Sequence, residues 1–117
     1  MSTHAIFVIG RDGTWLGALY RDSYPEGIAA VGPGLLALTA TDPDTYRTAV
    51  NDLLAVWEDD ERGHAVQPQH RNEPPPFYYD TAYVYAFDGT RVHIRTPDHT
   101  WILATDHPDV QTALHRK

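Results

Sequence analysis

Two Asp-Gly pairs, at residues 12–13 and 88–89, constrain the fold more than any other feature of this sequence. Asp-Gly favours the tight turns that join antiparallel strands, because both residues tolerate positive φ angles. Each pair stands between segments that are rich in apolar, β-branched and aromatic residues, as strands are. These segments are residues 4–9, 14–20, 79–87 and 90–95. The sequence therefore predicts two β-hairpins.

A two-residue turn at Asp12-Gly13 would pair Ile9 with Leu16 and Phe7 with Ala18. The opposite face would then carry Ile6, Val8, Trp15 and Leu19. Both faces of this hairpin are apolar, which is typical of strands that are covered on both sides. We expect the first hairpin to be central in the sheet.

The same geometry at Asp88-Gly89 would pair Tyr85 with Val92 and Tyr83 with Ile94. These aromatic and β-branched residues would form the core face of the second hairpin. The wetter face would carry Val84, Arg91, His93 and Arg95. A further strand is predicted over residues 100–105, which contain Trp101.

A long amphipathic helix is predicted from residue 41 to about residue 59. Thr41 or Asp42 can cap its first amides, and Pro43 suits its first turn. Apolar residues then recur on one side at helical spacing. They are Tyr46, Ala49, Val50, Leu53, Leu54 and Trp57.

Two shorter helices are expected as well. Leu35, Leu36 and Leu38 indicate one after the glycine-rich residues 27–34. The stretch 106–109 repeats the cap-and-proline start and leads to a helix with Val110, Ala113 and Leu114 facing inward.

The element order predicts one α+β domain over residues 1–117, since strands do not alternate singly with helices. We expect an antiparallel sheet of about five strands, made of two hairpins plus one strand, packed against two or three helices. Residues 62–76 are polar and Pro-rich and are predicted to form a long loop.

The net charge of −7 argues against direct binding to nucleic acid. The sequence has no cysteine, and its seven histidines lack the spacing of metal ligands, so no metal or cofactor is expected. The absence of a leader and of a long apolar run predicts a cytoplasmic protein without a membrane span. The acidic residues 58–61 fit either a solvated helix end or a contact for a basic partner.

The segment "YRDSYPEG", residues 20–27, has two interpretations. As a connector, it uses Pro25 to fix φ and Gly27 to permit unusual angles. As a recognition loop, it offers the bidentate fork of Arg21 and the rigid amphipathic ring of Tyr24. The candidate binding residues are Tyr20, Arg21, Asp22, Tyr24, Glu26 and, from the second hairpin, His93.

The leading hypothesis is a small acidic interaction protein without catalytic activity. It would bind a protein partner, or its own copy, through residues 20–27. The alternative is a domain that binds a small molecule or nucleotide, with hydrolytic chemistry as an extension. Its pocket would lie between the sheet and the Pro-rich loop.

The sequence also resembles small phage, prophage and bacterial proteins of unknown function that carry a "DGYP" motif after an N-terminal hairpin. The residues that carry the resemblance are Tyr20, Asp22, Tyr24, Pro25 and Gly27, and later Asp80, Tyr83, Tyr85, Asp88 and Gly89. Ser23 stands where the family has glycine, and the family's His-Trp pair is missing, so no site built on that pair carries over. The resemblance implies an α+β fold and a mobile-element origin.

Overall fold

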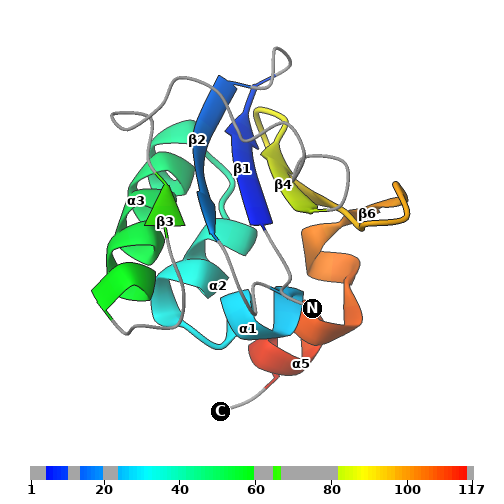
Figure 1. Ribbon diagram of the computed structural model, residues 1–117. Coiled ribbons are helices and arrows are strands. Elements are labelled where there is room, and N and C mark those ends of the chain that lie inside the picture. Colours follow the sequence, from blue (N-terminus) through cyan, green and yellow to red (C-terminus); the bar gives the residue numbers. More distant parts are fainter. Residues whose placement is uncertain (1–4, 11–13, 20–23, 60–64, 67–81, 116–117) are drawn as a thin grey trace.

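The computed structural model describes residues 5–10, 14–19, 24–59, 65–66 and 82–115. They form an α+β domain in which helices cover one face of a six-stranded sheet (Figure 1). The strands are β1 (Ala5–Ile9), β2 (Thr14–Leu19), β3 (Ala65–Val66), β4 (Tyr83–Phe87), β5 (Val92–Arg95) and β6 (Trp101–Leu103). The helices are α1 (Pro25–Ala29), α2 (Gly32–Leu38), α3 (Pro43–Asp59) and α5 (Pro108–Leu114), with a 3-10 turn, η1 (Ala104–Asp106), before α5.

The sheet is mixed, which corrects the expectation of an antiparallel sheet. Its strand order is β3-β2-β1-β4-β5-β6, and β1 and β4 run parallel at its centre while the other neighbours are antiparallel. All five residues of β1 are buried, as expected for a central strand that is covered on both faces. Within the described residues four α-helices accompany the sheet, against the two or three expected, and β3 lies within the stretch predicted as loop 62–76.

The register of the first hairpin differs from the prediction. Ile9 pairs with Thr14 and Phe7 with Gly17, and a β-bulge at Leu16 shifts the pairing between them. A one-residue shift moves every later side chain to the other face of the sheet. Leu19 therefore packs into the core beneath the helices. Ala18 lies where Leu19 was predicted, beside Ile6, Val8 and Trp15.

The second hairpin is shifted by two residues, which leaves each residue on its predicted face, but Val84 and Arg95 of the face predicted to be wetter are buried. Phe87 pairs with Val92 and Tyr85 with Ile94, because residues 88–91 form a wider turn than two residues would. Asp88 Oδ1 accepts hydrogen bonds from the backbone N–H groups of Thr90 and Arg91, each at 2.8 Å. Gly89 has a φ of 113° in this turn, a value that favours glycine.

Helix α3 confirms the sequence prediction in its bounds and in its buried side. The Thr45 N–H donates to Asp42 Oδ1 at 2.9 Å and the Thr45 hydroxyl donates to Asp42 Oδ2 at 2.6 Å, so Asp42 caps the helix start. These bonds lower the pKa of the Asp42 carboxyl. All six residues predicted to face inward are buried: Tyr46, Ala49, Val50, Leu53, Leu54 and Trp57.

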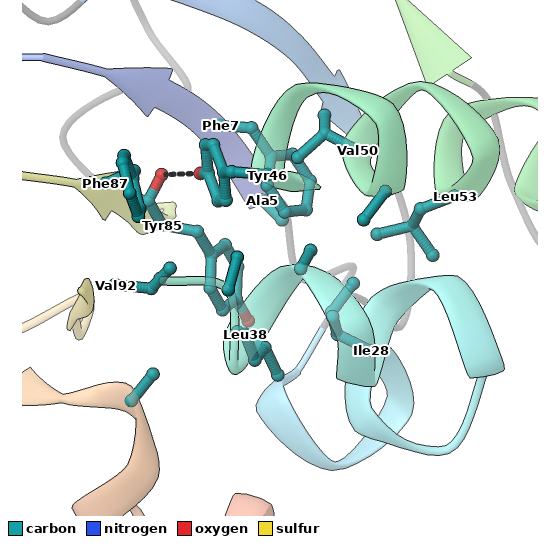
Figure 2. Close-up of a cluster of buried hydrophobic side chains, with 14 of the residues drawn as sticks. Ala5, Phe7, Ile28, Leu38, Tyr46, Val50, Leu53, Tyr85, Phe87 and Val92 are labelled. Atoms are coloured by element: carbon teal, nitrogen blue, oxygen red, sulfur yellow. Dashed lines mark hydrogen bonds between the residues drawn. The ribbon is translucent and has the colours of Figure 1, made fainter. Parts of the chain in front are cut away.

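The core joins α3 to the central strands through stacked aromatic rings. The Tyr46 ring stacks on Phe87 with centroids 5.2 Å apart, and Phe7 stacks on Tyr85 at 5.0 Å. The Tyr46 hydroxyl donates a hydrogen bond of 2.7 Å to the Tyr85 carbonyl oxygen, drawn as the dashed line in Figure 2. The hydroxyl is fully enclosed, and burial raises its pKa. A polar atom inside the core is thus paired, as buried polar atoms must be.

Two large apolar residues lie at the surface, and one of them, Leu114, was predicted to face inward. Trp101, on β6, is 53% exposed, and Leu114, at the end of α5, is 38% exposed. Val110 is buried and Ala113 half-buried, as predicted for the inner side of α5. Among the helices that the structure describes, none has both the length and the apolar character that a membrane crossing requires.

Candidate functional site

The segment 20–27 ends in a helix, not in a glycine-rich link. Tyr24 is the N-cap of α1, Pro25 occupies the first helical position, and Gly27 lies inside the helix. Proline suits this position because its fixed φ is helical and its missing N–H would have had no helical partner. The predicted connector role of Pro25 is therefore that of a helix start, whereas Gly27 adopts helical angles. Three of the predicted binding residues, Tyr20, Arg21 and Asp22, lie outside the described residues.

Tyr24 lies where the beginnings of α1, β4 and α5 meet. Its ring contacts Tyr83 edge to face, with centroids 6.2 Å apart, yet the residue is 46% exposed. Burial raises the pKa of the Tyr83 hydroxyl, and Asp109 and Tyr24 raise it further. Tyr24 thus has one side against the fold and the other open to solvent, as an aromatic contact residue would.

Glu26 lines a hollow of about 410 Å³ between α1, α2 and α5, which we call the α1–α5 hollow. Asp109 and Thr112 of α5 supply further polar groups, and the walls are small residues such as Ala30 and Gly32. His107 lies beside Asp109, and its Nδ1 accepts the Asp109 backbone N–H at 3.2 Å.

Close packing of α1 on α2 sets the width of this hollow. Gly34 of α2 approaches the backbone of α1 so closely that a Cβ there would lie 1.9 Å from the Ile28 carbonyl oxygen. Only a residue without a side chain allows this approach. Gly34 therefore fixes how Glu26 of α1 lies relative to α2.

A second hollow, of about 600 Å³, lies between α2 and α5 and is mostly apolar. Its lining includes Pro33, Leu35 and Leu36 of α2 and Leu114 of α5. Leu36 is 59% exposed, the largest exposure among the big apolar side chains that the structure describes. We call this the α2–α5 hollow.

A third hollow, of about 310 Å³, lies between α2 and α3 and is called the α2–α3 hollow. It is lined by Leu36, by Thr45 and Thr48, and by the carboxylates Asp44 and Asp52. Together the three hollows form what we call the outer helical surface.

His93 does not belong to this surface. It lies on β5 between Val92 and Ile94, whose side chains enter the core beneath the helices, so alternation along the strand places His93 on the other face of the sheet. Its Nε2 lies 2.7 Å from Asp88 Oδ2. The Arg91 and Thr90 backbone N–H groups and the His93 ring together hold the pKa of the Asp88 carboxyl well below its usual range. This arrangement fixes the β4–β5 turn, and the structure separates His93 from Tyr24 and Glu26.

Sequence reasoning missed the α2–α5 hollow, although a signal for it was present. Leu35, Leu36 and Leu38 stand within one seven-residue helix, and a period of 3.6 residues cannot direct all three inward. Leu38 is buried and Leu36 is exposed. The contribution of Leu114 had no such signal, because its exposure depends on where α5 docks.

Across the described part of the chain, no group of three or more His, Asp or Glu side chains could hold a metal ion. Comparisons with protein-family models, with curated proteins and with solved structures found no match for this chain.

Proposed function

We propose that this protein is a non-enzymatic interaction domain that binds a protein partner through the outer helical surface, with Tyr24 and Glu26 at its edge. The observation that carries the proposal is the α2–α5 hollow, where Leu36 and Leu114 are exposed around an apolar depression. Contiguous exposed apolar surface with a polar rim is typical of protein-binding sites. An apolar or aromatic anchor from a partner would fill such a depression.

The position of Tyr24 supports the same reading. Tyrosine presents a large and rigid contact area, and here the ring is braced by Tyr83 while half of it stays open. The contact also joins the two segments on which the resemblance to phage and prophage proteins rests. A mobile-element origin is part of the proposal.

The test compares what the full-length protein captures from a lysate of its native cells with what three variants capture. Leu36→Ser and Tyr24→Ala remove contact area at the outer helical surface, while Trp101→Ser removes an equally exposed apolar side chain on β6. The Trp101 variant should retain the partner. Leu36→Ser should lower the affinity for the partner about tenfold and no more, since the leucine is already partly buried before binding.

Equal capture by all four proteins would contradict the proposal. Light scattering on the purified protein tests self-association in the same way. If a dimer forms through this surface, Leu36→Ser should shift it to monomer and Trp101→Ser should not.

A small ligand is the second candidate, and the α1–α5 hollow favours it. Its volume of about 410 Å³ falls in the range of ligand sites, and Glu26, Asp109 and Thr112 provide acceptors for a cationic or hydroxylated compound. The pocket expected between the sheet and the Pro-rich loop involves residues outside the described ones. A thermal-shift screen tests this candidate, because a ligand at a hundredfold excess over its Kd adds about 2.7 kcal/mol to the free energy of unfolding. The shift should be lost in Glu26→Gln and kept in Leu36→Ser.

A further inference from the structure

The three hollows are parts of one continuous surface. The α1–α5 hollow and the α2–α5 hollow share Gly32, Leu35 and Ala113. The α2–α5 hollow and the α2–α3 hollow share Leu36. The outer helical surface therefore runs from α5 and α1 across α2 to the first half of α3 (Figure 1).

Charge and apolar character are separated along this surface. The middle, around Pro33, Leu36 and Leu114, carries no ionisable side chain among the described residues that line it. One end carries Glu26 and Asp109, and the other end carries Asp44 and Asp52. Every ionisable side chain that the described residues contribute to the three linings is thus acidic, on a chain whose net charge is −7.

We propose, building on the function proposed above, that the partner presents a basic amphipathic helix to this surface. Its apolar residues, at spacings of three and four, lie over the α2–α5 hollow, and lysines or arginines near both its ends face the two carboxylate pairs. A helix suits the surface because the surface is itself formed by helices, and side-chain ridges of one helix pack into grooves between others.

The same charges argue against a second copy of this chain as the occupant. In a two-fold dimer the same patch of each protomer faces its partner. Such a contact would place the carboxylates of Glu26, Asp44, Asp52 and Asp109 against an equally acidic surface, and juxtaposed like charges disfavour association. A cationic partner instead gains attraction at both ends.

The test uses three synthetic peptides of about four helical turns that share one amphipathic leucine pattern. Their polar positions are lysine, glutamate or serine. Binding to the full-length protein is measured by fluorescence anisotropy at low and at physiological salt. We expect the Leu/Lys peptide to bind at least about tenfold more tightly than the Leu/Glu peptide, and to weaken as salt screens the charges.

Variants of the protein then locate the contact. Leu36→Ser should abolish or strongly weaken binding of the Leu/Lys peptide. Glu26→Gln and Asp52→Asn, one at each end of the surface, should each weaken it several-fold. Asp106→Asn changes the net charge by the same amount but lies in η1, outside the three linings, so it should leave the affinity unchanged.

The outcomes separate the inference from the proposed function. If all three peptides bind equally and Leu36→Ser removes them all, the basic partner is wrong and the docking surface stands. If Asp106→Asn weakens binding as much as Asp52→Asn, the attraction is only that of net charge, and the inference is overturned. If Leu36→Ser leaves the affinity for the Leu/Lys peptide unchanged, or if no peptide binds, the inference is overturned. Either result also counts against the docking surface itself.

Discussion

Replacing Gly34 with alanine tests the packing on which the outer helical surface depends. The added Cβ would lie 1.9 Å from the Ile28 carbonyl oxygen and 2.8 Å from its carbonyl carbon. Real Cβ contacts are essentially never shorter than 3.0 Å, and the atoms in the way belong to a backbone that cannot rotate aside. Helices α1 and α2 would have to separate by about 1 Å, which opens a close-packed interior.

The expected loss follows from that displacement. Overpacking a core costs about 1–3 kcal/mol, and a clash with backbone belongs at the upper end of the range. The entropy of unfolding for 117 residues is about 0.25 kcal/mol per degree near 60 °C, so a loss of about 2–3 kcal/mol lowers Tm by about 8–12 °C. Gly32→Ala is the control in the same helix, because apart from the adjoining residues and the backbone of α2 itself a Cβ there meets nothing within 4 Å.

Thermal unfolding followed by circular dichroism measures both variants. Gly32→Ala should lose clearly less stability than Gly34→Ala, since the strain that its Cβ adds is confined to the contact with the following Pro33. If Gly34→Ala were equally stable, the close approach of α1 to α2 would be refuted. The shape of the α1–α5 hollow would be refuted with it, because that hollow depends on this approach.

Two further predictions concern single polar groups. Tyr46→Phe keeps the stack on Phe87 but leaves the Tyr85 carbonyl without its hydroxyl donor, so urea denaturation should show a loss of about 1–2 kcal/mol. The exposed control Tyr24→Phe should stay within about 0.5 kcal/mol of the wild type, and equal losses would contradict the buried bond. The fold lowers the pKa of the Asp88 carboxyl. Its ionised form therefore stabilises the protein at pH values above the unfolded-state pKa of about 3.9, and this contribution is lost as the pH falls below about 4. In Asp88→Asn the urea midpoint should therefore fall less between pH 7 and about pH 3 than in the wild type, whereas parallel curves would show that Asp88 contributes nothing to acid stability.

Local patterns in the sequence were enough to predict most elements of the fold. Helix α3 could be predicted because its cap at Asp42, its proline and its one-sided apolar spacing all lie within 17 consecutive residues or directly before them. The two hairpins were predicted from Asp-Gly, but their registers were not. A bulge at Leu16 and a four-residue turn after Phe87 depend on hydrogen bonds that a dipeptide does not specify.

The sequence singled out only part of the surface that we propose as a site. Tyr24 and Glu26 are exposed at the start of α1, as a recognition segment requires, whereas His93 lies on the other face of the sheet beside Asp88. The apolar part of the surface, around Leu36 and Leu114, was not predicted. It is formed by two helices that are far apart in the chain and that meet only in the folded protein.

The sequence by itself determined most of the segments that become helices and strands, with α1 and β3 as exceptions, because caps, turns and periodicity act over a few neighbouring residues. It also determined the acidity of the chain as a whole, whereas the fold decided that Glu26, Asp44, Asp52 and Asp109 line the outer helical surface. The tertiary structure alone decided that β4 joins β1 in parallel, that the bulge turns Leu19 toward the helices, and that Leu36 stays exposed. These outcomes depend on contacts between residues remote in sequence, and the apolar surface between α2 and α5 exists only through them.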